Sequence, residues 1–248
     1  MGKNKLKKFA EITTFENVFQ CPSQAVFANE MAHLAGSWHQ KFQNNNPIVL
    51  ELGCGRGEYT VGLSDLYPDK NFIGIDIKGA RLWAGAKAAL EDGKKNVLFL
   101  RTDIERLPQL FAKDEVSEIW ITFPDPQMKK STKRLTSSFF MQNYAHFLVN
   151  NGTIHLKTDS PFLYTYTQAM IQENQFVLQE NSADLYADSA LKTRQELTQL
   201  QTYYEQQWLE RGMTIKYLAW QLSHKTAYIE PEIEIEKDNY RSYGRYKR

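Results

Sequence analysis

The stretch from Ile48 to Tyr59 most strongly constrains the fold of this chain, because an apolar, β-branched run passes directly into alternating glycines. The run is typical of a buried strand, and Gly53, Gly55 and Gly57 follow at every second position. Such glycines let the backbone turn sharply and approach a ligand, and the segment after them has helical periodicity. We therefore predict a strand, a ligand-binding loop and the start of a helix.

The spacing of the glycines indicates which cofactor the loop binds. Loops that hold the pyrophosphate of a dinucleotide usually read G-x-G-x-x-G, whereas this chain has G-x-G-x-G with Glu51 two residues ahead. A carboxylate there would repel a pyrophosphate but could pair with a cation. S-adenosylmethionine (SAM) carries an ammonium and a sulfonium group and no phosphate, so it is the cofactor that we expect. For the loop taken alone, a glycine-rich turn without a ligand is the alternative.

Length and composition predict one domain with extensions. The chain has 248 residues, of which 42% are hydrophobic, and this is enough to bury one sizeable core without a second domain. Basic residues gather at the start of the chain, in its middle and at its end. We expect a flexible basic arm over residues 1–21, the cofactor-binding domain over residues 22–223 and a charged, mobile tail over residues 224–248.

Two further features concern the compartment. The chain contains only two cysteines, Cys21 and Cys54, which are far apart, and the second lies inside the glycine loop. This argues against a disulfide framework and for a reducing compartment. The chain also contains no apolar run long enough to cross a bilayer. We expect a soluble, cytoplasmic protein.

Strand and helix patterns alternate through the middle of the chain. Strand patterns occupy residues 48–52, 71–76, 96–102, 118–123, 153–158 and 215–222, and helical patterns occupy residues 24–42, 58–66, 79–90 and 183–211. This rhythm predicts an α/β fold with a mostly parallel, doubly wound sheet and helices on both of its faces.

A carboxylate stands at or just after the end of each of five predicted strands. These residues are Glu51, Asp76, Asp103, Asp125 and Asp159. In a doubly wound sheet the carboxyl ends of the strands share one edge, where ligands bind. Asp76 follows the glycines at the distance where an acidic side chain accepts the ribose hydroxyls, and Asp103 is placed to meet the adenine. A single such aspartate is as often a turn or helix-cap residue.

The stretch from Phe123 to Leu135 points to the substrate. Pro124 and Pro126 stiffen the backbone on either side of Asp125, which fixes this carboxylate at the mouth of the site. Four basic residues follow closely, namely Lys129, Lys130, Lys133 and Arg134. Several cations over an extended surface suit a long polyanion better than a small substrate. We therefore predict a nucleic acid as the substrate.

Together these motifs resemble the TrmB-type tRNA (guanine-N7-)-methyltransferases, a family within the class I SAM-dependent methyltransferases. The resemblance covers about residues 20–222 and rests on five blocks, which are Glu51–Gly57, Gly74–Asp76, Phe123–Arg134, Leu156–Asp159 and Thr202–Glu205. The glycine loop marks only the broad class, whereas the proline-flanked aspartate with its basic tail and the late Thr-x-x-Glu are more specific. Where the family commonly has Trp-Pro, this chain has Gln127-Met128.

The resemblance implies a Rossmann-like class I fold, SAM as the cofactor and methylation of guanine N7 in the variable loop of tRNA, conventionally at position 46. It implies cofactor contacts by Glu51, Gly53, Gly55, Asp76, Asp103 and Asp125. Asp125 is also implied as the catalytic residue. It implies substrate contacts by Lys129, Asp159, Thr202, Tyr203, Tyr204 and Glu205, and RNA backbone contacts by Lys130, Lys133 and Arg134. The partner is then tRNA, the chain is a monomer or a homodimer, and no second subunit is required.

The chemistry of guanine supports a positioning role for Asp125. Guanine N7 has an exposed lone pair and no proton, so its attack on a sulfonium methyl group needs orientation rather than a general base. Because the purine gains positive charge as the bond forms, a nearby carboxylate stabilises the transition state more than the ground state. We therefore assign Asp125 a positioning and electrostatic role.

Other kinds of site lack their usual patterns. The histidines His33, His39, His146, His155 and His224 show no H-E-x-x-H pairing, so we expect no metal site. The chain has no G-x-S-x-G elbow and no GxxxxGK[ST] phosphate loop. Three alternatives stay open at this point: a methyltransferase acting on a protein or small molecule, an RNA-binding module without turnover, and, least favoured, an NAD-dependent oxidoreductase.

Overall fold

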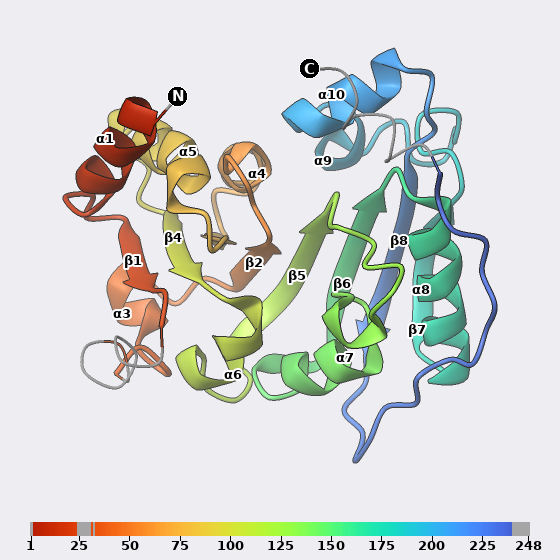
Figure 1. Cartoon of the computed structure of the whole chain (residues 1–248). Helices are drawn as coiled ribbons and strands as arrows, with labels where there is room; N and C mark the ends of the chain where they lie inside the picture. Colours follow the sequence, from red (N-terminus) through yellow and green to blue (C-terminus); the bar gives the residue numbers. More distant parts are fainter. Residues whose placement is uncertain (1, 24–30, 32, 240–248) are drawn as a thin grey trace.

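The computed structural model describes residues 2–23, 31 and 33–239, and in this part of the chain eight strands form one sheet (Figure 1). The strands are β1 (Val18–Cys21), β2 (Ile48–Leu52), β3 (Asn71–Ile75), β4 (Val97–Thr102), β5 (Val116–Thr122), β6 (Leu148–Thr158), β7 (Val177–Ser182) and β8 (Lys216–Leu222). Their order is β1-β4-β3-β2-β5-β6-β8-β7. All pairs from β1 to β6 are parallel, and only β8 runs against its neighbours. The predicted mostly parallel, doubly wound sheet is therefore confirmed.

Helices cover both faces of the sheet (Figure 1). They are α1 (Gly2–Ile12), α3 (Trp38–Phe42), α4 (Glu58–Leu66), α5 (Gly79–Glu91), α6 (Leu107–Leu110), α7 (Ser138–Tyr144), α8 (Pro161–Glu173), α9 (Gln195–Thr198) and α10 (Tyr203–Glu210). Short 3-10 helices span Ile104–Arg106 and Ser131–Lys133. The two faces follow from side-chain alternation along the strands. In β2, Ile48, Leu50 and Leu52 join the core cluster under α3, α6, α7 and α8, whereas Val49 faces α4 and α9.

The start of the chain differs from the predicted flexible arm. Residues 2–12 form α1, which packs against α5, and β1 extends the sheet beyond β4. Ile12 is fully buried, and the indole N–H of Trp83 donates to the Glu11 carboxylate at 3.0 Å. The lysines that suggested a solvated arm therefore belong to a helix that is anchored through its last turn at Ile12, while Leu6 is 72% exposed. Our prediction of a flexible arm over residues 1–21 was wrong over the part that the structure describes.

Two long predicted helices are also shorter in the structure. The helix expected over residues 24–42 is interrupted at residues 33–37, because the chain turns at Gly36, where φ is +79°. In the described part, Met31 has π-helical geometry and only α3 is a regular α-helix. Residues 24–30 and 32 lie outside the described residues. The polar segment 183–211 contains two short helices, α9 and α10, because Thr202 starts a new helix with its own capping box.

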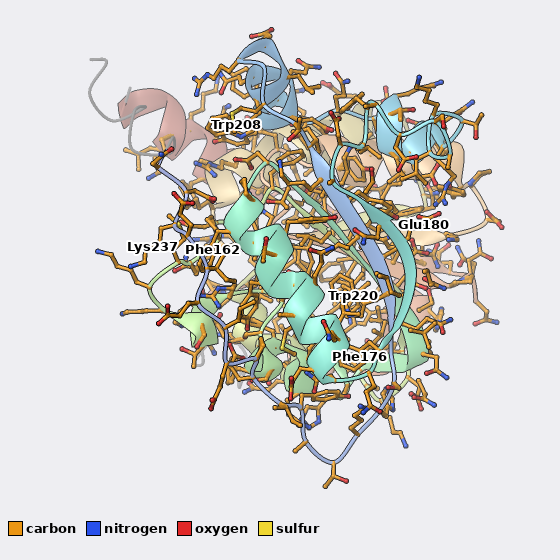
Figure 2. The ribbon with its side chains drawn as sticks, turned by 90° about the vertical axis from the view of Figure 1, so that its right-hand side faces the viewer. Phe162, Phe176, Glu180, Trp208, Trp220 and Lys237 are labelled. Atoms are coloured by element: carbon orange, nitrogen blue, oxygen red, sulfur yellow. The ribbon has the colours of Figure 1, made fainter. Side chains whose placement is uncertain are left out.

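The tail after β8 has no helix or strand up to residue 239, yet it is anchored along α8 (Figure 2). Ile229 exchanges backbone hydrogen bonds with the side chain of Asn174 at the carboxyl end of α8. Glu230 accepts hydrogen bonds from Ser138 and Tyr166, and Asp238 accepts from Ser160 and from the backbone N–H of Phe162 at the amino end of α8. The expected mobile tail is thus wrong for residues 224–239, and the remainder lies outside the described residues.

Candidate active site

The glycine loop crosses the end of β3. Gly53, Gly55 and Gly57 have φ of +75°, +58° and +73°, which only glycine adopts without strain. The backbone N–H groups of Gly53 and Cys54 both donate to the carbonyl of Ile75, at 2.8 and 2.9 Å. These bonds hold the loop over the carboxyl edge of the sheet, and Gly57 then begins α4.

Helix α5 presses on the loop from the other side. A Cβ atom on Gly85 would lie 2.6 Å from the carbonyl oxygen of Arg56 and 2.9 Å from the Cα atom of Gly57. Neither backbone atom could move away without changing the loop. The loop therefore has one shape, which is fixed from below by β3 and from the side by α5.

Asp76 is held by two backbone donors at the edge of a cavity. Its carboxylate accepts from the N–H of Gly55 at 3.0 Å and from the N–H of Lys78 at 2.7 Å. A charge-assisted pair of this kind fixes both the side chain and the turn after β3. The carboxylate is therefore oriented before any ligand arrives, as a residue that accepts hydroxyl groups should be.

Two adjoining cavities lie at this edge and share Gly53, Arg81 and Phe123 in their walls. The larger cavity has a volume of about 400 Å³, and its walls include Asp76, Asp103 and Asp125. The smaller cavity has a volume of about 200 Å³, and its walls include Gly55, Thr122, Thr202, Tyr203 and Tyr204. The carboxyl ends of β2 to β5 thus open onto one continuous hollow, as expected for a doubly wound sheet.

Glu51 lies behind the glycine loop rather than in the cavity wall. It is 2% exposed, and its carboxylate accepts from the backbone N–H and hydroxyl of Thr60 and from the hydroxyl of Thr122 at 2.7 Å. Burial raises the pKa of Glu51 to about 7, although these hydrogen bonds oppose the shift. Since Thr122 lines the smaller cavity, one hydroxyl separates this carboxylate from a ligand.

The loop that carries Asp125 is strained and pinned. Phe123 and Gln127 both have left-handed backbone conformations, with φ of 49° and 47°, and the N–H of Gln127 donates to the Asp125 carboxylate at 3.0 Å. Arg134 donates to the carbonyls of Pro126 and Gln127, each at 3.1 Å. The exposed carboxylate of Asp125 is therefore presented to the larger cavity by a rigid turn.

The basic residues after Asp125 separate into two groups. Lys129 and Lys130 are exposed, and Lys133 is exposed beside the larger cavity, where it pairs with Glu105 at 2.7 Å. Arg134 is only 6% exposed, and its guanidinium lies 4.0 Å from the ring centre of Tyr166. Arg134 therefore holds the Asp125 loop through its two hydrogen bonds to the backbone carbonyls of that loop, whereas we predicted that it contacts the RNA backbone.

Thr202 and Glu205 form the capping box that starts α10. The Thr202 hydroxyl accepts from the N–H of Glu205 at 3.1 Å, while the Glu205 carboxylate accepts from Lys157 and Tyr186, each at 2.8 Å. Glu205 and Lys157 are fully buried. Asp159 is also fully buried. Of the predicted substrate-binding residues in this region, only Thr202, Tyr203 and Tyr204 reach a cavity wall.

Sequence reasoning missed three residues that shape the site. Arg81 lines both cavities, Phe123 lines both as well, and Lys157 supports α10 from below. Phe123 and Lys157 stand inside blocks already singled out as motifs, where their neighbours attracted the assignment. Arg81 carries no signal in the sequence, because it is one of several cations on a helical face.

A further cavity of about 360 Å³ lies on the α4 side of the sheet, away from the glycine loop. Its charged side chains bind one another: Glu118 lies 3.2 Å from His155 and 2.7 Å from Lys70, and Arg194 pairs with two glutamates. The His155 ring also stacks on Trp120 with a centroid distance of 4.0 Å. The charged side chains of this cavity are thus largely paired with one another, and none of the predicted site residues lines it.

Two negative findings concern the described residues only. No group of three or more His, Cys, Asp or Glu side chains is arranged there to hold a metal ion. In residues 2–23, 31 and 33–239, no helix combines the length and apolar character needed to cross a membrane.

Comparison with solved structures supports the fold. The crystal structure of the 16S rRNA methyltransferase KamB aligns with a TM-score of 0.59 at 17% identity and covers 76% of this chain and 94% of that one. A second solved structure, of an antibiotic-related methyltransferase, aligns with a TM-score of 0.55 at 16% identity and covers 75% and 92% of the two chains. The fold that these methyltransferases share, a mostly parallel doubly wound sheet with helices on both faces, is therefore confirmed for this chain.

Comparison of sequences is more specific. A family model described as "Putative methyltransferase" matches residues 45–218. The tRNA (guanine-N(7)-)-methyltransferase of Bacteroides fragilis is 56% identical over 100% of this chain and 97% of its own length. That of Porphyromonas gingivalis is 57% identical over 95% and 97%, and that of Oceanobacillus iheyensis is 34% identical over 73% and 83%. With more than half of its residues identical over nearly the whole length of these relatives, the chain belongs to the family of tRNA (guanine-N(7)-)-methyltransferases.

Proposed function

We propose that this protein transfers the methyl group of SAM to N7 of the guanosine at position 46 in the variable loop of tRNA. The observation that carries this proposal is the continuous hollow between the glycine loop and the Asp125 loop, beside exposed lysines. SAM supplies an electrophilic methyl group bound to a sulfonium sulfur. The cavity walls contain carboxylates and no phosphate-binding loop, which suits a cationic, phosphate-free molecule.

Within this hollow we assign the roles as follows. Asp76, oriented by two N–H groups, would accept the ribose hydroxyls, and Asp103 would lie by the adenine. The glycine loop would pass beneath the methionyl part. Asp125 would face the guanine and stabilise the positive charge that the purine gains as N7 bonds to the methyl carbon and the carbon–sulfur bond breaks. Lys129 and Lys130 would bind the RNA backbone.

The same proposal covers the setting of the reaction. We place it in the cytoplasm, with tRNA as the only obligatory partner and with the chain acting as a monomer or a homodimer. A substrate other than tRNA, or RNA binding without turnover, is left as an outcome of the test below.

The direct test is transfer of labelled methyl from SAM to an unmodified tRNA transcript, with the product mapped by chemical cleavage at 7-methylguanosine. We expect one cleavage site in the variable loop. A matched transcript with adenosine at position 46 should take up no label. The proposal would be contradicted if the label appeared on another base or on protein, or if neither transcript were labelled. The fold and the family would stay as they are.

Glu51 predicts a pH dependence of SAM affinity. Its pKa of about 7 lies above the ordinary value for a carboxyl group, so near pH 6 the cofactor-free protein holds a proton there that a nearby cationic ligand would displace. Affinity should therefore rise as pH increases from about 6 to about 8, with proton release on binding near pH 7. Calorimetry in buffers of different ionisation enthalpy measures both quantities.

The matched control is Glu51→Gln, which keeps the size of the side chain and cannot titrate. It should bind SAM with an affinity that no longer changes over this pH range. If wild type and Glu51→Gln show the same pH profile, another group is responsible and the electrostatic role of Glu51 is refuted.

A further inference from the structure

Two exposed tyrosines stand at the rim of the smaller cavity. Tyr203 and Tyr204 are the first residues of α10, and their exposed fractions are 47% and 43%. The ring centroids lie 5.9 Å apart with an interplanar angle of 70°. Because Thr202 and Glu205 cap the helix immediately beneath them, the backbone that carries both rings is fixed. Two large aromatic rings are thus left available next to the reaction site.

An arginine lies over each of these rings. The guanidinium carbon of Arg56 is 5.7 Å from the ring centre of Tyr203, and that of Arg81 is 6.0 Å from the ring centre of Tyr204. Arg56 comes from the glycine loop and Arg81 from α5, so three elements converge here. We refer to Arg56, Arg81, Tyr203 and Tyr204 as the aromatic–arginine cluster.

Both arginines are exposed, and only Arg56 has a carboxylate partner in the described part of the chain. The Arg56 side chain is 52% exposed and lies 3.8 Å from the Glu58 carboxylate, which also accepts the N–H of Tyr203 at 3.1 Å. Arg81 is exposed and forms no ion pair with any residue in the described part of the chain. The cluster therefore keeps positive charge in the wall of the smaller cavity, where a polyanion would reach it.

This combination matches the chemistry of single-stranded RNA. Proteins bind unpaired nucleotides by stacking bases on aromatic rings while cations follow the phosphates, and arginine over an aromatic ring strengthens the stacking platform. A guanosine can place N7 against a methyl donor only if its neighbours in the loop are also held. The cluster lines the smaller cavity, which adjoins the larger one through Arg81, so it lies within reach of nucleotides next to a guanosine bound at Asp125.

We propose that the aromatic–arginine cluster binds the nucleotides flanking the target guanosine, with Tyr203 and Tyr204 stacking on their bases and Arg56 and Arg81 pairing with their phosphates. This inference rests on the proposed function, because it takes the tRNA loop as the occupant. It adds two phosphate-binding arginines, from the glycine loop and from α5, to the basic run after Asp125.

The test measures binding, independently of methyl transfer. Affinity for unmodified tRNA is followed by fluorescence anisotropy, and affinity for SAM by calorimetry. Tyr204→Leu should weaken tRNA binding about tenfold, since base stacking on an aromatic ring contributes on this scale. Arg81→Gln should lower the slope of log K against log salt by about 0.7 to 0.9, the loss of one phosphate contact. Neither change should alter SAM affinity by more than about twofold.

Matched variants separate the cluster from general effects. Arg211→Gln removes an arginine that lies 4.9 Å from the ring of Trp208 on the same helix α10 but lines neither cavity, and it should bind tRNA like wild type. Arg81→Lys keeps the charge and should keep the salt slope. Two further transcripts lack the base at position 45 or at position 47. On the transcript that lacks the base stacked on Tyr204, wild type and Tyr204→Leu should bind with equal affinity.

Two outcomes would overturn the inference. If Arg81→Gln lowers the affinity for SAM and leaves the tRNA affinity and the salt slope unchanged, the cluster binds the carboxylate of the cofactor. If Tyr204→Leu lowers the affinity for the intact transcript and for both abasic transcripts by the same factor, no base stacks on Tyr204. Because these readouts are affinities, they do not depend on turnover; if the wild-type enzyme proves to methylate a different position, the abasic sites are placed on either side of that position instead.

Discussion

Replacing Asp125 by alanine is expected to lower kcat/KM for tRNA methylation by about 10²- to 10³-fold, the usual loss when one preorganised electrostatic contact to the transition state is removed. The carboxylate is exposed to the larger cavity and oriented by the rigid turn that ends at Gln127. Its charge opposes the positive charge that develops on the purine. Because no proton has to leave N7, the loss should appear in the chemical step, with tRNA affinity changed only a few-fold.

Asp125→Asn separates charge from geometry. An asparagine oxygen can still accept the N–H of Gln127, which the carboxylate accepts at 3.0 Å, so the turn should survive while the charge is lost. If charge is decisive, single-turnover rates of Asp125→Asn and Asp125→Ala should fall together. If Asp125→Asn retains most of the wild-type rate, Asp125 acts only by shaping the turn, and the electrostatic role is wrong.

The position of the site could be predicted from the sequence because it depends on local patterns. Alternating glycines after an apolar run, and aspartates after later runs, are placed on one edge by the parallel sheet alone. Asp76, Asp103 and Asp125 accordingly line one cavity. The predicted helix over residues 58–66 coincides with α4, because Gly57 and the apolar period that follows mark its start.

The surroundings of the site could not be predicted because they depend on contacts between distant segments. Nothing local distinguishes Arg134, which is buried against Tyr166, from Lys133, which is exposed. The lysine-rich start of the chain suggests a solvated arm, because its sequence does not show that α1 packs against α5 and buries Ile12. The composition of the acidic tail likewise suggests a mobile segment, although Glu230 and Asp238 accept hydrogen bonds from residues of α7 and α8.

The buried pair of Lys157 and Glu205 shows the same limit most clearly, because both residues stand in motifs that suggest substrate contact. The ammonium group donates to the Glu205 carboxylate at 2.8 Å and to the carbonyl of Leu197 at 2.8 Å, and neither side chain is exposed. Burial lowers the pKa of Lys157, while the Glu205 charge opposes this shift. The pair ties β6 to the start of α10 and thus supports the rim of the smaller cavity.

Lys157→Met should therefore destabilise the protein by about 3 to 5 kcal/mol, because it leaves the Glu205 carboxylate buried without its cation. Urea unfolding followed by circular dichroism measures this loss, which corresponds to a decrease in Tm of about 10 °C. The tRNA affinity of the folded fraction should fall more than its SAM affinity, since α10 carries the exposed tyrosines while Asp76 is held by the glycine loop.

The double variant Lys157→Met/Glu205→Met tests whether charge pairing is the cause. Replacing a buried ion pair by apolar side chains of similar size is often neutral in stability, so the double variant should recover most of what Lys157→Met loses. It should nevertheless remain impaired in tRNA binding, because Thr202 loses the reciprocal half of its capping box and the start of α10 is freed. A double variant as unstable as the sum of its single changes would show that the two residues contribute independently, and that the pair does not position α10.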